Sequence, residues 1–410
     1  HGKNAMETVR LGLIGCGGAM ARFHETYFKD VDGLTYAACT DMNAAAAVES
    51  SEKHGCKPYD TAEALIDSGE VDLILIATPH FTHPIFAQRA FDKGINVITE
   101  KPLAVTAHDG QATIDAFEAA RRTKADLIFA GMFQQRTFAT WATVKRLCTD
   151  GSIGEIMRVN WTITDWFRTQ TYYDAGGWRA TWKGEGGGVL LNQCPHNLDL
   201  LCWFVGQPSK VTAIAELGKH HHIEVEDDVT AILQWPNGAS GTFITSTGQT
   251  PGINRLEIVG KNGTLIADLM PSDEAHTLTY YRTHEPVDKF TKKCPERFAE
   301  VPADKLVITP ADGDSRPNHQ RIVQNVVDTI RFSKGQDNLL TPAPEGLFGL
   351  ELGNAMLMSG LKASPVDLPM PAEGGLSRKA YADLIVHMGE TSSFVKNEVK
   401  ESKADMAGSF

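Results

Sequence analysis

VRLGLIGCGGAMARFH, residues 9–24, joins an apolar run to a glycine-rich turn and then to a segment typical of a helix. Gly15 and Gly17 stand where the run ends, and glycines there permit a tight turn and a close approach of backbone to a pyrophosphate. Met20 occupies the third position of this fingerprint, where glycine or alanine is usual, so the stretch alone also fits an ordinary strand-to-helix turn. The predicted pyrophosphate-binding residues are Gly15, Gly17, Gly18, Ala19 and Met20.

The first third of the chain alternates short apolar runs with helical segments. Apolar runs that are continuous rather than alternating indicate a parallel sheet covered on both faces. Asp41 ends the second run, where its carboxylate can accept hydrogen bonds from both ribose hydroxyls of an adenosine, although it could instead cap the helix at 44–54. We therefore predict an α/β domain over residues 6–132, a Rossmann doubly wound parallel sheet that binds NAD. Its apolar runs are 9–15, 34–41, 71–79, 95–100 and 125–133.

After about residue 150 the pattern changes to longer, partly alternating runs. Asn237-Gly238 and Asn262-Gly263 fall between successive runs, and Asn-Gly is a strong hairpin signal. A second α/β domain with a large open, mainly antiparallel sheet is expected over 133–370, for substrate binding and oligomerisation. Residues 371–410 are polar and predict a C-terminal helix and a tail.

Composition excludes several function classes. The 410 residues carry a net charge of -12 without a basic patch, which argues against a nucleic-acid partner. No apolar stretch is long enough to cross a membrane, so no membrane partner is expected. The seven cysteines are scattered and form no C-x-x-C pair, a pattern typical of reduced thiols in the cytoplasm. His1 to Ala5 are expected to be left over from expression, with Met6 as the natural start.

GEGGGVLLNQCPHNLDLLCW, residues 184–203, carries a polar stripe in an apolar segment. Asn192, His196 and Asp199 have the spacing i, i+4 and i+7, which places them along one face of a helix. Such a stripe is either the solvated side of an amphipathic helix or the wall of a pocket in which the imidazole moves a proton.

The segment 77–106, ATPHFTHPIFAQRAFDKGINVITEKPLAVT, resembles the Gfo/Idh/MocA family of nicotinamide-dependent oxidoreductases, which includes glucose–fructose oxidoreductase and inositol dehydrogenases. The resemblance rests on the A-T-P turn, His83 and Glu100-Lys101-Pro102, and it continues to about residue 370 through GSIGEI, the glycine-rich stripe segment, IEVEDD and VDLP. It implies the two-domain fold described above, and a homodimer or homotetramer. The cofactor residues that it adds are Thr78, Pro79, His83, Glu100 and Lys101.

The resemblance also assigns chemistry. In such enzymes the lysine of the E-K-P motif lies beside the nicotinamide and a histidine acts as base; the matching residues are Lys101 and His196. The stripe is then expected to face a cleft between the domains. Asn192 stands where many members have aspartate, and an amide cannot supply a negative charge that raises the pKa of the histidine. Asp199 could take over that role. Asp41, followed by no arginine, predicts NAD rather than NADP.

Residues 165–188 form an aromatic and arginine-rich segment that fits the stacking of a sugar ring, although it could equally be an apolar loop or a subunit contact. We predict an NAD-dependent dehydrogenase that oxidises a ring hydroxyl of a sugar, glycoside or cyclitol, a carbohydrate or polyol substrate, to a keto sugar. A glycosidase using transient oxidation by NAD, or a non-catalytic regulator that senses NAD or sugar, are the alternatives. The predicted catalytic residues are Lys101, His196 and Asn192, and the predicted substrate-binding residues are Lys101, Arg168, Tyr173, Arg179, Asn192 and His196.

The histidines suggest a metal site at first sight. His80, His83 and the run 220–222 have no recognisable ligand spacing with cysteine or a carboxylate. No metal is therefore predicted, and the run is expected to be a solvated loop.

Overall fold

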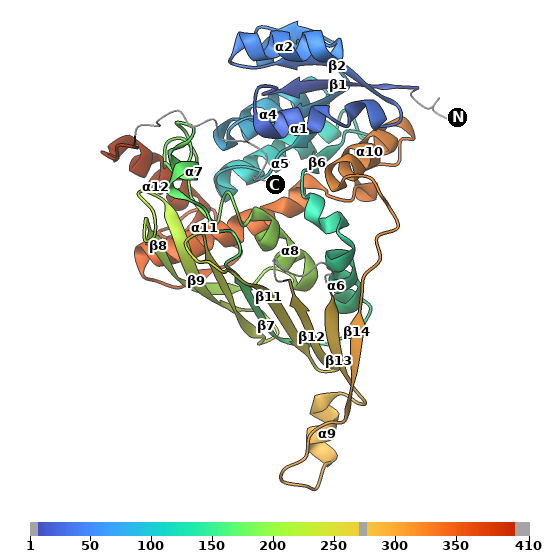
Figure 1. Cartoon of the computed structure of the whole chain (residues 1–410), viewed down its shortest axis with the longest axis vertical. Coiled ribbons are helices and arrows are strands. Elements are labelled where there is room, and N and C mark those ends of the chain that lie inside the picture. Colours follow the sequence, from blue (N-terminus) through green and yellow to red (C-terminus); the bar gives the residue numbers. More distant parts are fainter. Residues whose placement is uncertain (1–6, 270–276, 398–410) are drawn as a thin grey trace. The chain divides into compact units, whose positions relative to one another are not determined.

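The computed structural model describes residues 7–269 and 277–397, so the expectations for Met6 and for the end of the tail lie outside it. The chain divides into two compact units, drawn with their elements in Figure 1. Among the described residues, the first unit comprises 7–137, 315–350 and 397, and the second comprises 138–314 and 351–396.

The first unit contains a six-stranded sheet in the order β3-β2-β1-β4-β5-β6, with all strands parallel. Every residue of β4 and β5 is buried, which is why their sequences are continuously apolar or nearly so. The strands are β1 (Val9–Ile14), β2 (Leu34–Thr40), β3 (Lys57–Tyr59), β4 (Leu73–Ile76), β5 (Asn96–Thr99) and β6 (Phe129–Gly131). The helices are α1 (Ala19–Glu25), α2 (Ala44–His54), α3 (Ala62–Asp67), α4 (His83–Asp92), α5 (Ala107–Arg121) and α10 (Asn318–Arg331).

The strand order reverses direction between β1 and β4. In doubly wound sheets a ligand binds outside the carboxyl ends of the strands at such a reversal. Gly15 follows β1, Asp41 follows β2, Ala77 follows β4 and Glu100 follows β5. The predicted cofactor residues therefore stand together at the carboxyl edge of this sheet.

Residues 315–350 complete the first unit, although the sequence assigned them to the second domain by position. The side-chain amide of Gln336 pairs with the backbone of Phe129 in β6, donating to its carbonyl at 2.7 Å and accepting from its N–H at 2.9 Å. Helix α10 buries Ile322, Val323 and Val326 in the same core cluster as β1.

The second unit contains a nine-stranded sheet in the order β14-β13-β12-β11-β7-β10-β9-β8-β15. Its neighbours are antiparallel except β7 and β10, and the Asn-Gly pairs at 237 and 262 connect β9 to β10 and β11 to β12, as predicted. The strands are β7 (Ile156–Ile163), β8 (Lys210–Leu217), β9 (Glu226–Gln234), β10 (Ser240–Ser246), β11 (Asn254–Gly260), β12 (Gly263–Asp268), β13 (Leu278–Thr283), β14 (Ala303–Ile308) and β15 (Val366–Asp367). The helices are α6 (Ala139–Thr149), α7 (Gln170–Asp174), α8 (Pro195–Val205), α9 (Val287–Lys293), most of α11 (Gly346–Lys362) and α12 (Arg378–Thr391).

One face of this sheet is covered and the other is open. Trp161 of β7 is fully buried against Trp141 of α6 and Phe204 of α8, which lie on the same side of the sheet (Figure 1). On the opposite face, Ile214 of β8 is 66% exposed and Ile232 of β9 is 56% exposed. None of the helices in residues 7–269 and 277–397 is long and apolar enough to cross a membrane.

Candidate functional site

Two glycines in the turn after β1, Gly15 and Gly17, stand where a side chain would lie too close to its neighbours. Gly15 has a φ of +91°, and a Cβ there would lie 2.7 Å from the carbonyl oxygen of Ala77. A Cβ on Gly17 would lie 2.9 Å from Oδ2 of Asp41. Helix α1 begins at Ala19 directly after Gly18, its N-cap, so backbone N–H groups rather than a side chain stand at this turn. A turn without side chains at the start of a helix fits the pyrophosphate of a dinucleotide.

Asp41 holds the turn and does not cap α2. Its Oδ2 accepts a hydrogen bond from the N–H of Gly17 at 2.7 Å, and its Oδ1 accepts one from the N–H of Asn43 at 2.8 Å. Asn43 itself is the N-cap of α2, because its side chain accepts from the N–H of Ala45. A carboxylate has further lone pairs beyond these two bonds, so Asp41 can still accept from ribose hydroxyls.

His83 joins the loops that follow β4 and β5. Its side chain is buried, with Nδ1 at 2.8 Å from the carbonyl oxygen of Pro102 and Nε2 at 2.8 Å from that of Thr78. Burial lowers the pKa of this histidine. Thr78 and Pro79, predicted to contact the cofactor, are thus tied to the loop that carries Lys101.

Glu100 is an ionised carboxylate beside Lys101. One oxygen accepts from Nε2 of His24 at 2.7 Å, and the other accepts from the backbone N–H of Lys101 at 3.2 Å. Burial alone would raise the pKa of Glu100, but the hydrogen bond from His24 and the charge of that ring hold it at about 2. The second ring nitrogen of His24 contacts the hydroxyl of Tyr27.

His319 of α10 completes this group. Its ring lies 5.7 Å from that of His24, and burial lowers the pKa of His319 to about 4. Neither His24 nor His319 was predicted from the sequence, since His24 lies 76 residues before Glu100 and His319 lies 219 residues after it.

In the second unit, the predicted polar stripe is only partly helical. Helix α8 begins at Pro195, so His196 and Asp199 lie on it while Asn192 lies in the turn before it. The prediction of one helical face for all three was therefore wrong, because proline favours the first turn of a helix and starts a new one here. His196 is 6% exposed and Asp199 is 2% exposed, which excludes the solvated side of a helix.

Glu226 holds the turn that carries Asn192. Its carboxyl oxygens accept from the N–H of Gly188 at 2.9 Å and from the N–H of Leu190 at 3.0 Å. Burial raises the pKa of Glu226 to about 7 even though these backbone bonds lower it. Asn192 in turn donates its amide N–H to Glu185, a second buried carboxylate in this turn.

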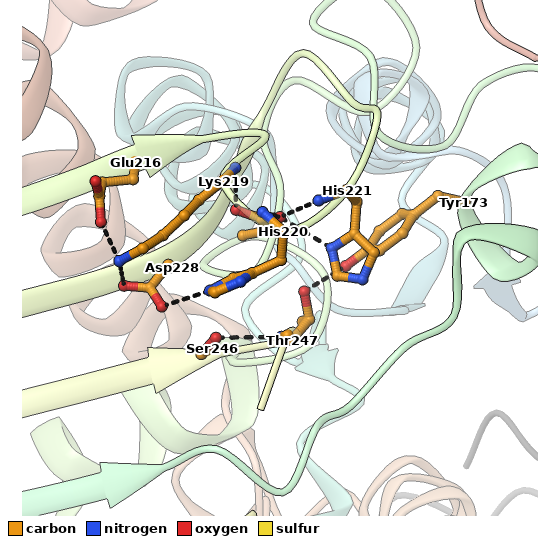
Figure 2. Close-up of polar contacts among 10 residues, drawn as sticks. Tyr173, Glu216, Lys219, His220, His221, Asp228, Ser246 and Thr247 are labelled. Carbon is orange, nitrogen blue, oxygen red and sulfur yellow. Dashed lines mark hydrogen bonds and ion pairs between the residues drawn. The ribbon is translucent and has the colours of Figure 1, made fainter. Parts of the chain in front are cut away.

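Both arginines of the aromatic segment contact Tyr172 rather than Tyr173. The guanidinium carbons of Arg168 and Arg179 lie 5.1 and 5.0 Å from the centroid of the Tyr172 ring, and Arg179 also donates to its hydroxyl at 2.9 Å. Tyr173 is buried, and its hydroxyl donates to Oγ1 of Thr247 at 2.8 Å (Figure 2).

His220 and His221 lie in a network with acidic side chains, shown in Figure 2. His220 contacts Asp228 at 3.0 Å, while His221 contacts Asp227 at 2.9 Å through Nδ1 and the carbonyl oxygen of Arg168 at 2.9 Å through Nε2. The expected solvated loop fits 220 and 222, but the side chain of His221 is only 6% exposed. Burial lowers the pKa of His221, and its two hydrogen bonds raise it by more. Among the residues that the structure describes, no three His, Cys, Asp or Glu side chains gather as metal ligands would.

The predicted site residues thus form two groups. Those assigned to the cofactor, together with Lys101, belong to the first unit, whereas Arg168, Tyr173, Arg179, Asn192 and His196 belong to the second. Glu185, Glu226, His24, His319 and Tyr172 join these groups in the structure and were not among the predicted residues.

Comparison with known proteins matches both units. Residues 9–125 match the model described as the oxidoreductase family with NAD-binding Rossmann fold, and residues 141–266 match the GFO/IDH/MocA C-terminal domain. An inositol 2-dehydrogenase of Rhizobium meliloti is 28% identical over 64% of this chain and 76% of its own length. A levoglucosan dehydrogenase of Pseudarthrobacter phenanthrenivorans is 24% identical over 66% of this chain and 76% of its own length.

Among solved structures, the WlbA dehydrogenase of Chromobacterium violaceum in complex with NADH and UDP-GlcNAcA aligns with a TM-score of 0.74 and 27% identity. The alignment covers 90% of this chain and 99% of that one. The parallel sheet with its glycine turn, the nine-stranded sheet and these matches agree with one another, and the chain belongs to the Gfo/Idh/MocA family of NAD-binding oxidoreductases.

Proposed function

We propose that the protein is an NAD-dependent dehydrogenase that oxidises a ring hydroxyl of a sugar, glycoside or cyclitol to a ketone. The main support is the arrangement at the carboxyl edge of the first sheet. The glycine turn follows β1, Asp41 follows β2, and the buried, ionised Glu100 immediately precedes Lys101 after β5. A dinucleotide bound at this edge meets a lysine whose backbone is fixed by Glu100 and His24.

The reaction needs two events at the substrate carbon. A hydride leaves the carbon and the hydroxyl proton is lost, so that a C–O single bond becomes a carbonyl; bound NAD supplies the hydride acceptor. His196, a histidine on a buried helix, takes the proton, and the Lys101 side chain stabilises the developing alkoxide. Asn192 holds the substrate or the imidazole through its amide.

The substrate class follows from the second unit and from the relatives. Arg168, Tyr172 and Arg179 combine aromatic faces with hydrogen-bond donors, which suits the apolar face and the hydroxyls of a sugar ring. The matched relatives are named for levoglucosan and inositol, and the aligned WlbA structure contains a nucleotide sugar. These compounds share secondary hydroxyls on a six-membered ring.

The decisive experiment is a panel of polyols, pyranoses and glycosides incubated with NAD, with NADH absorbance as readout and mass spectrometry of the products. We expect NADH and a keto product two mass units lighter than the substrate. Cleavage of a glycoside without net NADH would replace the proposal by a redox-neutral glycosidase. Sugar or NAD binding without turnover of any compound would replace it by a sensor.

Cofactor choice has its own test. The carboxylate of Asp41 would repel the 2′-phosphate of NADP, and Met42 and Asn43 provide no cation to offset it. The wild type should show a higher kcat/KM with NAD than with NADP, and Asp41→Ser should reduce that preference by on the order of tenfold or more. Asp30→Ser, a change of an aspartate beyond the turn, is the control. An unchanged preference in Asp41→Ser would contradict the assignment.

We also propose a homodimer or homotetramer in the cytoplasm. The exposed isoleucines on the open face of the nine-stranded sheet, Ile214 and Ile232, support burial of that face against a second copy. In the described part of the chain none of the cysteines forms a disulfide, which fits a reducing compartment. Light scattering of the wild type and of Ile214→Lys/Ile232→Lys tests the assembly; a stable wild-type monomer would refute it.

A further inference from the structure

Glu185 occupies a position that the proposed function leaves without a role. It is 1% exposed, and it lies seven residues before Asn192 in the glycine-rich turn. One of its carboxyl oxygens, Oε2, accepts from the backbone N–H of Ala180 at 2.6 Å. The other, Oε1, accepts from Nδ2 of Asn192. Both oxygens of a buried carboxylate therefore face donors.

We propose that Glu185 is a positioning residue that fixes the direction of the Asn192 amide and brings a negative charge within one hydrogen bond of it. The inference rests on the proposed function, because it gives Asn192 a place in the reaction. Glu185 acts through Asn192 and does not touch the substrate.

The chemistry of the two groups decides the direction. An ionised carboxylate can only accept hydrogen bonds, whereas a side-chain amide has a donor end and an acceptor end. Glu185 therefore requires Nδ2 of Asn192 to point toward it. The carbonyl oxygen Oδ1, on the opposite branch of the planar amide, is then the atom that Asn192 offers to other groups. Asn192 presents an acceptor, as an aspartate would, while the charge resides on Glu185.

Both ends of this hydrogen bond are anchored independently. On the Glu185 side, its own N–H donates to the carbonyl of Thr181 at 2.9 Å, and the N–H of Trp182 donates to Glu224 at 2.7 Å. On the Asn192 side, the backbone N–H donates to the carbonyl of Gly188 at 2.9 Å. Gly188 is in turn held by Glu226. The carboxylate thus meets the amide in a turn that is already rigid, which is the condition for fixing its orientation.

Because of this hydrogen bond, a single substitution at position 185 or 192 should have a different effect from the two substitutions combined. In Asn192→Asp two carboxylates face each other in a buried turn, and like charges at that distance cannot both remain ionised. In Glu185→Gln the side chain keeps only one acceptor for two donors, so the Ala180 contact is lost or the Asn192 amide turns over. In the double variant the introduced glutamine accepts from Ala180 and donates to the introduced aspartate. Both hydrogen bonds are therefore restored, and in the bond between the two side chains the donor and the acceptor are exchanged.

The experiment is therefore a double-mutant cycle of E185Q, N192D and E185Q/N192D, with kcat/KM on the best polyol or sugar and the thermal midpoint as readouts. We expect E185Q to lower kcat/KM by roughly tenfold and N192D by more at neutral pH, with part of that loss recovered as pH falls and one carboxyl takes a proton. The double variant should lose less than either single variant. E155Q, which removes an exposed carboxylate that pairs with Lys261 and lies outside the glycine-rich turn, is the control and should leave turnover within about twofold of wild type.

The outcomes separate this inference from the proposed function. If the wild type oxidises no compound of the panel, the proposed function fails, and the thermal midpoints alone report whether positions 185 and 192 are coupled. If the wild type is active and the losses of the two single variants multiply in the double variant, the pair does not act together and the inference is overturned. Coupling in the midpoints without coupling in kcat/KM would overturn the positioning role as well, because Glu185 would then be structural only.

Discussion

Glu100 in the first unit and Glu226 in the second are both buried glutamates close to predicted catalytic residues. The pKa values of their carboxyl groups are nevertheless very different. The pKa of Glu100 lies at about 2 and that of Glu226 at about 7. Glu100 accepts a hydrogen bond from the ring of His24, and the hydrogen bond and electrostatic interaction with this ring both lower the pKa of Glu100. Within the described residues, the donors to the Glu226 carboxyl group are the backbone N–H groups of Gly188 and Leu190.

The difference teaches that burial does not fix the charge of a carboxyl group; its partners do. The hydrogen bond and the electrostatic attraction of the His24 ring outweigh the desolvation of Glu100, whereas peptide dipoles do not outweigh that of Glu226. The first unit thus keeps a permanent negative charge beside Lys101. The second unit keeps a carboxyl group that changes its charge near neutral pH at the turn before His196.

The largest expected effect is a loss of kcat on substitution of the predicted catalytic residues, His196 in the second unit and Lys101 in the first. His196→Ala should lower kcat by roughly a hundred- to ten-thousand-fold, the usual range for a positioned acid–base group, with NAD binding retained. Lys101→Ala should lower kcat too, and should also weaken nicotinamide or substrate binding. Steady-state kinetics and NAD titration calorimetry measure both effects, with His222→Ala, an exposed histidine, as control. Near-normal turnover in His196→Ala would mean that the proton leaves by another route.

The next prediction concerns Glu100. Because its folded pKa is lowered from 4.5 to about 2, its ionised form stabilises the fold above about pH 4.5, and this stabilisation is lost as pH falls toward 2. The free energy of unfolding should fall by on the order of 3 kcal/mol over that window. Glu100→Gln should remove this acid dependence and lower stability at neutral pH. Urea unfolding at several pH values measures it, and the exposed Glu118→Gln should keep the wild-type slope.

Glu226 should show the opposite sign. Its folded pKa is raised from 4.5 to about 7, so its protonated form stabilises the fold below about pH 4.5, and stability is lost as pH rises through 7. Glu226→Gln, which cannot ionise, should therefore gain stability relative to wild type between about pH 5 and 8, by up to on the order of 3 kcal/mol. A parallel pH dependence of Glu226→Gln and wild type would remove the contrast between the two glutamates.

The smallest effect concerns His221, where an imidazole lies between two acceptors. Only the protonated ring can donate to both Asp227 and the carbonyl of Arg168, which is why its pKa lies above 6.5. The stabilisation is complete below about pH 6.5 and is lost as pH rises through the folded pKa. His221→Gln should cost about 1 kcal/mol below that pH and less above it. His222→Gln, at an exposed histidine whose ring contacts the carbonyl oxygen of Val395, is the control in thermal unfolding.

Much of the fold could be predicted because it depends on local sequence. The glycine turn at 15–17 and Asp41 lie within one strand–helix–strand unit, and both Asn-Gly pairs connect strands that are neighbours in sequence. The return of residues 315–350 to the first unit could not be predicted in this way. It depends on contacts such as that between Gln336 and Phe129, which are 207 residues apart.

The site follows the same rule. Sequence motifs predicted that Lys101 follows a strand and that His196 lies on a helix. They did not predict the partners that determine the charge of the nearby carboxyl groups. Glu226 reaches Gly188 across 38 residues, and His24 reaches Glu100 across 76. The sequence predicted a helix at Asn192 because Asn192, His196 and Asp199 have helical spacing. The hydrogen bonds that Glu226 accepts from this turn, and the proline at 195, impose a different backbone.

The close contact between Gly188 and Glu226 limits which substitutions could change the substrate range of this protein. A Cβ at Gly188 would collide with the backbone of Glu226 itself, and backbone, unlike a flexible side chain, cannot move aside. A library of variants at this glycine would therefore consist almost wholly of proteins that fail to fold. Tyr172 and Arg179 have half-exposed side chains, unlike the buried Tyr173 and Ala180 beside them. Randomising Tyr172 and Arg179, with Gly188 kept, is the route by which substrate range can be broadened.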